Sequence, residues 1–198
     1  MKKAITTIFK EVKNISISST WDVKGLNKYI GYIKKCLDEL YKHEASLFTN
    51  NLCERCLVFR FAYYLQNYFG REYFVDCDYN SSCYYDPITK EWKRRNGKPI
   101  PDQKRGEIKK RFIDIIVHKR GFDNSDLICF EIKKWNNITK DGIKKDKNNL
   151  RILTSQFGYS FGFHLFFGKT KDKTKIRIFN KGKFVKSLGI NDLQGYVE

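Results

Sequence analysis

The sequence predicts a mixed α/β (α+β) fold, in which helices flank a central mixed β-sheet. Short apolar runs rich in Ile, Val and Phe, each bounded by turn residues, indicate buried strands in the middle and C-terminal parts of the chain. Amphipathic segments with a period of 3.6 residues stand before and between these runs. The chain has 198 residues, enough for one substantial core but short for two, so we expect a single domain over residues 1–198.

The composition combines a sufficient apolar core with a large excess of positive charge. A net charge of +17 and an isoelectric point near 9.6 favour an anionic partner, with nucleic acid as the first candidate. A basic surface that serves only solubility is the alternative. No apolar run approaches the roughly 20 residues of a membrane span, and residues 1–7 carry no evident secretory signal. We therefore expect no membrane association, a cytoplasmic location and six reduced cysteines.

Residues 1–48 are predicted to form an N-terminal extension that carries one amphipathic helix. Loose alternation of isoleucines within residues 1–20 is compatible with an edge hairpin. From Asp22 to about Lys42 the apolar residues follow a helical period. This helix either packs on the core, grips DNA or provides a homodimer interface, and the sequence leaves these roles open. The residues that define its apolar face are Leu26, Tyr29, Ile30, Ile33, Leu37, Leu40 and Tyr41.

A second helix is predicted to begin near Asn50–Asn51 and to end at Gly70. Glu54 stands four residues before Val58, which opens the apolar stripe, so its carboxyl group should face the core side. Alternatively, Asn51-x-x-Glu54 approximates a capping box, in which Glu54 would only close the helix N-terminus. The stripe comprises Val58, Phe61, Leu65 and Tyr68. Residues 72–80 follow as the first predicted core strand.

The segment from Lys90 to Arg111 is the most basic part of the chain. Gly97, Pro99 and Pro101 predict irregular structure through its middle. A flexible basic loop can bind a phosphate backbone while an aromatic side chain stacks on a base, although a solvated charged surface explains the same pattern equally well. The candidate nucleic-acid contacts in this segment are Trp92, Lys93, Arg94, Arg95, Lys104 and Arg105.

Two apolar runs, Arg111–His118 and Leu127–Lys134, predict a hairpin of buried strands. Each run contains an acid, Asp114 in the first and Glu131 in the second. A buried carboxylate is costly unless a cation or hydrogen bonds compensate it. Because side chains alternate along a strand, Glu131 and Lys133 should share a face. Two acids and a lysine on adjacent strands can hold a divalent metal ion and a water molecule beside a phosphate.

A third helix is predicted within residues 138–156, with an apolar side and a basic side. Lys147 and Arg151 on the basic side are further candidate nucleic-acid contacts. A core strand between Gly162 and Gly168 follows, and residues 175–179 and 184–188 predict a C-terminal hairpin. The organisation is therefore a core over residues 49–180, with a last hairpin strand and tail over residues 181–198.

The motif Asp114 … Glu131-Ile132-Lys133 resembles that of the PD-(D/E)xK nuclease superfamily, whose members have a restriction-endonuclease-like fold. The resemblance covers roughly residues 50–180, and the predicted order of elements is similar to the αβββαβ core of that fold. One departure is Ile113, because a proline commonly precedes the first acid. The resemblance implies metal-dependent hydrolysis of phosphodiester bonds in nucleic acid, DNA more than RNA, with Mg²⁺ or Mn²⁺ as the cofactor.

The same resemblance implies a role for each residue of the motif. Asp114, Glu131 and the carbonyl of Ile132 would bind the metal ion, and Lys133 would orient the attacking water or stabilise the developing charge. Glu54 matches a helical glutamate that assists the metal site in such enzymes. The alternative is a catalytically inactive protein with a nuclease fold, which binds nucleic acid or an acidic protein partner.

The cysteines raise a separate question, because Cys53-x-x-Cys56 together with Cys77 and Cys83 suggests a zinc site. No second Cys-x-x-Cys pair accompanies the first. Free cysteines are among the most frequently buried residues in proteins. The sequence therefore favours cysteines packed in the core over zinc ligands.

Overall fold

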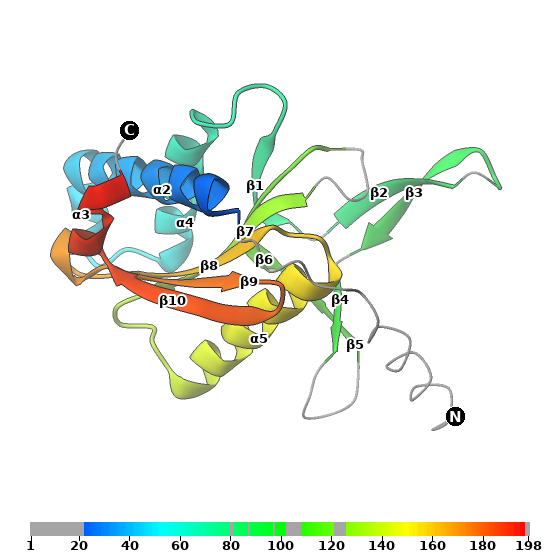
Figure 1. Ribbon diagram of the computed structural model, residues 1–198. Coiled ribbons are helices and arrows are strands. Elements are labelled where there is room, and N and C mark those ends of the chain that lie inside the picture. The colour runs from blue at the N-terminus through cyan, green and yellow to red at the C-terminus, as the bar shows by residue number, and fades with distance from the viewer. Residues whose placement is uncertain are drawn as a thin grey trace.

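The computed structural model describes residues 22–79, 81–86, 88–96, 98–101, 108–120 and 126–196. These residues form a mixed α/β structure, in which helices flank a six-stranded mixed sheet (Figure 1). The prediction of a mixed α/β fold with a central mixed sheet is thus confirmed. The edge hairpin expected within residues 1–20 lies outside the described residues.

The six-stranded sheet has the order β1-β6-β7-β8-β9-β10, with β7 near its centre. Neighbouring strands are antiparallel except β7 and β8, which are parallel. Parallel neighbours need a crossover connection, and helix α5 (Lys140–Gln156) provides it. The strands are β1 (Phe74–Tyr79), β6 (Ile113–His118), β7 (Asp126–Lys134), β8 (Phe161–Phe167), β9 (Lys175–Asn180) and β10 (Lys183–Gly189).

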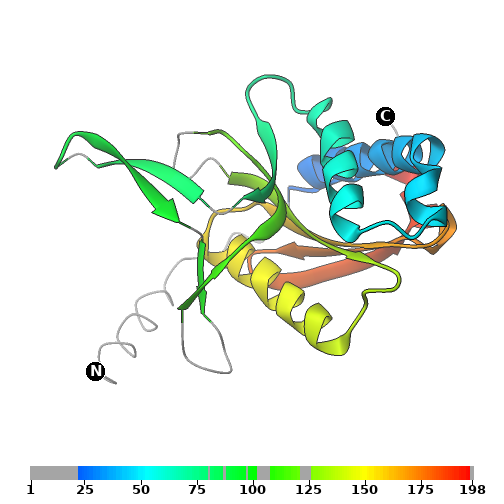
Figure 2. The same ribbon diagram turned by 180° about the vertical axis from the view of Figure 1, so that it is seen from behind.

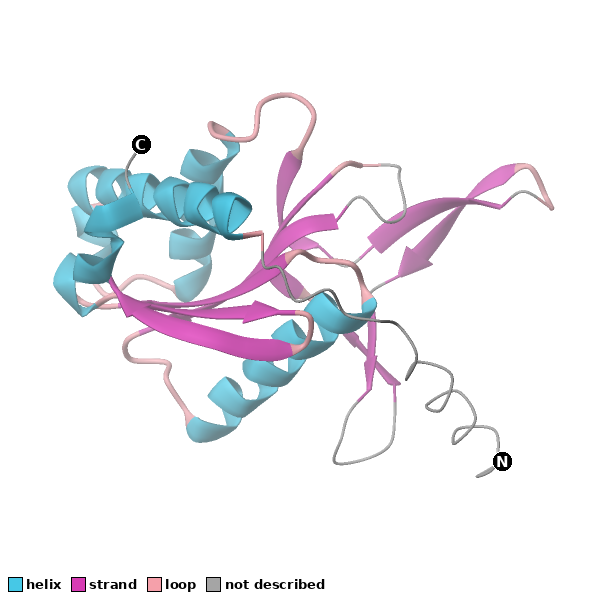
Figure 3. Cartoon of the chain, viewed as in Figure 1, coloured by secondary structure: helices cyan, strands magenta, loops and turns pink. Residues whose placement is uncertain are grey.

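Three helices cover one face of this sheet and α5 covers the other, as Figures 1 and 3 show. The three are α2 (Val23–His43), α3 (Ala45–Thr49) and α4 (Glu54–Gln66). Two short 3₁₀ helices, η2 (Lys171–Lys173) and η3 (Ile190–Tyr196), pack against α2. Because α2 buries the predicted apolar stripe against the core, its packing role is confirmed.

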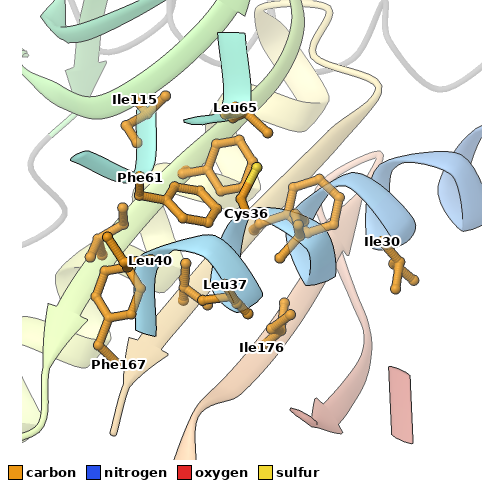
Figure 4. Packing of buried hydrophobic residues seen from close by; sticks show 14 of the residues in the cluster. Ile30, Cys36, Leu37, Leu40, Phe61, Leu65, Ile115, Phe167 and Ile176 are labelled. Carbon is orange, nitrogen blue, oxygen red and sulfur yellow. The ribbon is translucent and has the colours of Figure 1, made fainter. Parts of the chain in front are cut away.

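The larger core lies between α2, α4 and the sheet, and Figure 4 shows its centre. Phe61 of α4 is fully buried, with ring centroids 5.7 Å from Phe130 and 5.9 Å from Phe167. A smaller core joins α5 to the opposite face through Leu150 and Leu153. The sheet is therefore buried on both faces, which explains why its central strands are almost continuously apolar.

Helix α4 begins later than predicted, at Glu54 rather than near Asn50. Asn51 has a positive φ of 53°, which interrupts the helical path after α3. Cys53 occupies the N-cap position, so the proposed capping box between Asn51 and Glu54 does not form and that alternative is wrong. Asn51 instead accepts a hydrogen bond of 2.7 Å from Lys134 Nζ.

The basic segment that was predicted to be irregular contains regular strands, so this prediction is wrong. Strands β2 (Ser81–Asp86) and β3 (Glu91–Asn96) pair with each other, as do β4 (Lys98–Pro101) and β5 (Ile108–Arg111). Both pairs are two-stranded ribbons, and proline is tolerated in such edge strands because it need not donate to a second neighbour. Figure 2 shows both ribbons projecting away from the main sheet.

The C-terminal hairpin is confirmed as β9 and β10. A two-residue turn joins the strands, with Lys181 at φ 46° and Gly182 at φ 76°. Two positive φ values in succession suit the twist of a hairpin, and glycine adopts that conformation without strain.

Candidate functional site

The register between β6 and β7 brings the two predicted acids together. Ile115 pairs with Phe130, so the next step along these antiparallel strands sets Asp114 opposite Glu131. Residues directly opposite each other in a sheet point to the same face. Lys133 shares that face because it lies two positions beyond Glu131. All three predicted side chains therefore lie on the face that α5 covers.

Asp114 is mostly buried and is held by the backbone of the neighbouring strand. Its Oδ2 accepts a hydrogen bond of 2.6 Å from the N–H of Ile132. Burial raises the pKa of Asp114 to about 6, although the Ile132 N–H and the Lys133 ammonium both act against that rise. The carboxyl group is thus poised to exchange a proton near neutral pH.

Glu131 is more deeply buried, with 3% of its surface exposed. Asn149 of α5 donates a hydrogen bond of 2.9 Å from Nδ2 to Glu131 Oε1. Burial raises the pKa of Glu131 well above its ordinary value, and the nearby carboxyl groups of Asp114 and Asp146 raise it further. The hydrogen bond from Asn149 and the charge of Lys133 act in the opposite direction, but the net shift of this pKa is upward.

Lys133 is the cation at the centre of the site. Its Nζ lies 2.9 Å from the Ile132 carbonyl, 3.2 Å from Asp146 Oδ2 and 3.6 Å from Glu54 Oε1. Burial by itself lowers the pKa of Lys133, but the neighbouring acids outweigh it and the net shift is upward. Lys133 therefore stays an ammonium group, and because only 17% of its side chain is exposed it is not a surface lysine.

Glu54 reaches the site from the first turn of α4, as predicted from its inward-facing position. Its Oε2 accepts a hydrogen bond of 2.7 Å from the N–H of Lys134, eighty residues further along the chain. Its other oxygen forms the ion pair with Lys133. Glu54 thereby ties the start of α4 to the end of β7 and faces the ammonium rather than the helix N-terminus.

Three site residues escaped the sequence analysis as functional candidates: Asp146, Asn149 and His164. Asp146 and Asn149 are spaced three apart on α5, in phase with Leu150 and Leu153, so their burial could have been inferred from helical periodicity. His164 pairs with Glu131 in the parallel register of β7 and β8, and no local signal reveals that pairing. Its Nε2 lies 3.4 Å from Asp146 Oδ2, and burial lowers its pKa, so it is neutral.

Four carboxyl groups, those of Glu54, Asp114, Glu131 and Asp146, thus surround the single ammonium of Lys133. This is a local surplus of negative charge within a chain whose net charge is +17. Burial first, and the neighbouring carboxyl groups second, raise the pKa values of Asp114 and Glu131. The site is electrostatically suited to an additional cation.

A hard divalent ion requires several oxygen donors that lie close together. Within the described residues, no three His, Cys, Asp or Glu side chains gather closely enough to hold a metal ion on their own. Two buried carboxyl groups and the Ile132 carbonyl remain, and oxygen donors of these kinds suit Mg²⁺ or Mn²⁺ when water completes the shell. The fit therefore depends on the backbone carbonyl as much as on the side chains.

A basic surface lies on the outer side of α5, directly behind the site. It surrounds a depression of about 380 Å³ and includes the predicted contacts Lys147 and Arg151. The other predicted contacts are less well defined: Lys104 and Arg105 lie outside the described residues, and only the backbone of residues 92–95 is described, in β3. The residues that line the depression are Lys140, Ile143, Lys144, Lys147, Asn148 and Arg151.

The cysteines divide into two groups. Cys36 and Cys129 are buried in the core as predicted, but Cys53 is exposed and Cys56 only partly buried, so core packing is wrong for this pair. Their Sγ atoms are 3.1 Å apart, and the hydrogen bond from Cys56 lowers the pKa of the Cys53 thiol. Cys77 is partly buried, and the side chain of Cys83 is not among those described.

Comparison with known proteins identifies no relative: no family model, no curated protein and no solved structure matches the chain. Among the helices formed by the described residues, none combines the length and apolar character needed to cross a bilayer. The geometry and electrostatics of the site are therefore the basis for inferring the function of the protein.

Proposed function

We propose that the protein is a metal-dependent nuclease that hydrolyses phosphodiester bonds in nucleic acid, with DNA favoured over RNA. The observation that carries this proposal is the convergence of Asp114, Glu131 and Lys133 on one face of adjacent strands, where carboxyl groups outnumber the ammonium group. The order of the elements also supports it, because an antiparallel β1-β6-β7 meander followed by α5 and a parallel β8 is similar to the core expected for PD-(D/E)xK nucleases.

The chain's own groups have distinct roles in the proposed reaction. Asp114, Glu131 and the Ile132 carbonyl would hold the divalent ion. A bound Mg²⁺ or Mn²⁺ would supply Lewis-acid activation of the phosphate and of the attacking water. Lys133 contributes a fixed positive charge that stabilises the charge developing on the phosphate in the transition state. Asp146 and Glu54 position this ammonium, which they contact at 3.2 and 3.6 Å.

The basic elements around the site support nucleic acid as the substrate. The β2–β3 ribbon follows Tyr79 and the β4–β5 ribbon precedes Ile113, and these two residues are paired across β1 and β6. Both ribbons therefore leave the body beside Asp114. Lysine and arginine are frequent in β3 and β5, and the exposed side of α5 adds further cations. Basic residues on both sides of the site could bind the phosphate backbone of a nucleic acid that crosses it.

A second function keeps the binding and omits the hydrolysis. It is favoured by one observation: no group of three metal-ligating side chains occurs within the described residues, and Lys133 Nζ already bonds to the Ile132 carbonyl. In that case the ammonium would only neutralise the buried acids. The protein would then bind nucleic acid, or an acidic protein partner, through its basic surfaces.

A cleavage assay separates the two functions. Purified protein is incubated with single- and double-stranded DNA and RNA in the presence of Mg²⁺, Mn²⁺ or EDTA. We expect metal-dependent cleavage that Asp114→Asn, Glu131→Gln and Lys133→Ala each reduce at least a hundredfold, because each removes a metal ligand or the transition-state cation. Glu72→Gln is the matched control, since Glu72 is an exposed acid (side-chain exposure 79%) that precedes β1.

Two outcomes would overturn the nuclease proposal. Cleavage that survives all three substitutions would indicate a contaminating enzyme or a different site. Salt-sensitive binding without cleavage under any metal condition would establish the binding protein instead.

A further inference from the structure

The thiols of Cys53 and Cys56 form an isolated pair at the start of α4. Their Sγ atoms are 3.1 Å apart, about 1 Å longer than a disulfide bond of roughly 2.05 Å. Residues three apart at the start of a helix lie on the same side, so closing this gap needs only small side-chain rotations. The separation is that of two thiols in contact, one donating a hydrogen bond to the other.

Accessibility distinguishes this pair from the buried cysteines. Cys53 is exposed and Cys56 is partly buried, whereas Cys36 and Cys129 are fully enclosed. Cys53 is the N-cap residue of α4, and its side chain makes no capping hydrogen bond. Among the described residues, the sulfur of Cys53 forms a hydrogen bond with Cys56 alone. It also lies at a helix N-terminus, where the helix dipole favours the thiolate form.

We propose that Cys53 and Cys56 are a reversible dithiol–disulfide couple. They form a redox modification site beside Glu54, at the edge of the group of carboxyl side chains around Lys133. The oxidant is a low-molecular-weight disulfide. The Cys53 thiolate attacks one sulfur of that disulfide, which forms a mixed disulfide and releases one thiol. The Cys56 sulfur then attacks Cys53 in the mixed disulfide and releases the second thiol, so two protein thiols are oxidised as one external disulfide is reduced.

The position of the pair couples it to the candidate site. Glu54 lies between the two cysteines and accepts a hydrogen bond from Lys134 N at 2.7 Å. The carbonyl of Leu52 also accepts a hydrogen bond from Lys134 Nζ. A new covalent bond across the first turn of α4 therefore acts on the same segment that holds Glu54 against β7.

The test uses the intact, folded protein in buffers of reduced and oxidised glutathione, quenched with acid and measured by intact-mass spectrometry. We expect the wild type to lose two hydrogen atoms in mass, with the bond mapped to residues 53 and 56 and reversed by dithiothreitol. Cys53→Ser and Cys56→Ser should instead accumulate a mixed disulfide with one glutathione. Cys77→Ser, which changes a partly buried cysteine outside the pair, should behave as the wild type.

A stable glutathione adduct in the wild type, a disulfide between two chains, or no oxidation of the folded protein would each overturn the proposal. Circular dichroism of every variant verifies that it is folded. Amide hydrogen exchange at Lys134 reports the coupling: exchange should change at least several-fold between the two redox forms, and an unchanged rate would refute that part. None of these measurements requires nuclease activity, so they succeed or fail independently of the proposed function.

Discussion

The single ammonium group of Lys133 neutralises only part of the charge of the four carboxyl groups around it. In the absence of a bound cation, burial and mutual repulsion favour protonation of Asp114 and Glu131. The same interactions that would bind a divalent ion therefore destabilise the ion-free protein at neutral pH. This opposition makes the site sensitive to pH, to metal and to the removal of single charges.

The first prediction concerns the pH dependence of stability without metal. The pKa of Asp114 is raised from 3.8 to about 6 in the folded protein, so between these values the folded state binds more protons than the unfolded state. The contribution of Asp114 to stability should then fall by up to roughly 3 kcal/mol as pH rises from about 4 to about 6. Urea unfolding in EDTA at several pH values measures it.

The matched variant is Asp114→Asn, which keeps the acceptor oxygen for Ile132 N–H but does not titrate. Its stability should decline less than that of the wild type over the same interval. A wild type whose stability rises relative to the variant between pH 4 and 6 would show that the folded-state pKa of Asp114 is not raised.

A second prediction concerns Asp146, which attracts Lys133 and repels Glu131. Asp146→Asn should lower the pKa of Lys133, because a stabilising negative charge is lost, and should also lower the pKa of Glu131, because a repulsive one is lost. Nuclear magnetic resonance titration of the two side chains measures both pKa values. A loss of packing alone would expose both groups to water, which lowers the pKa of an acid and raises the pKa of a base. A decrease in both pKa values therefore indicates the loss of a negative charge.

Asp38→Asn is the control for this substitution, since Asp38 pairs with Lys34 at 3.3 Å on α2. It should leave both pKa values unchanged. If Asp146→Asn raised the pKa of Lys133, the ion pair at 3.2 Å would not be the interaction that holds this ammonium.

Helix α5 has different functions on its two sides. The buried side supplies Asp146 and Asn149 to the site, and the exposed side carries the basic residues around the depression. The helix thus links the charge that positions Lys133 to the surface proposed to bind phosphate.

The third prediction tests this outer surface. The double substitution Lys147→Ala with Arg151→Ala should weaken nucleic-acid binding for all sequences and should reduce the slope of log affinity against log salt by about two. Fluorescence anisotropy across a series of salt concentrations measures both effects. Lys24→Ala with Lys42→Ala removes the same charge from exposed positions on α2, on the opposite face of the sheet, and should change the slope far less. Equal effects of the two double variants would mean that only net charge matters.

How far the sequence predicts these elements depends on whether the deciding contacts are local. The strand period identified β6 and β7 and set Glu131 and Lys133 on one face, and the helical period identified α2 and α5. The β4–β5 ribbon was missed because Pro99 and Pro101 exclude a central strand but not an edge strand. The start of α4 was misplaced because Asn51 bonds to Lys134, a contact that only the folded chain creates.

The site shows the same limit. Asp114, Glu131, Lys133 and Glu54 were predicted because each stands out against an apolar pattern in its own segment. The neutral partner His164 gives no such signal, since its nearest site contact is with Asp146 on another element. Two polar residues that meet only through tertiary packing cannot be recognised from their spacing in the chain.

The whole molecule divides into a sheet-and-helix body and two appended ribbons, and the fourth prediction tests this division. Strands β2 and β3 do not pair with the six-stranded sheet, and their ends Ser81 and Asn96 are paired with each other. A short Gly-Ser bridge that replaces residues 81–96 should therefore keep the melting temperature within a few degrees of the wild type. It should also weaken nucleic-acid binding at least tenfold, because it removes the basic strand β3.

Circular dichroism during thermal unfolding measures the melting temperature. Fluorescence anisotropy with the same DNA for both proteins measures the binding affinity. Phe61→Ala is the control for the body, since this fully buried ring should cost about 3–5 kcal/mol when removed. A hairpin replacement that unfolds as readily as Phe61→Ala would show that the ribbon is part of the core.

Tyr79 and Ile113 are partners across adjoining strands, so the chain between them departs from and returns to nearly the same point. Because its two ends are adjacent, the segment 80–112 can change in length and composition during evolution without displacing Asp114, Glu131 or Lys133. Descendants of a common ancestor could thus change residues 80–112 while inheriting the proposed site unaltered. We expect divergence among such descendants to concentrate there.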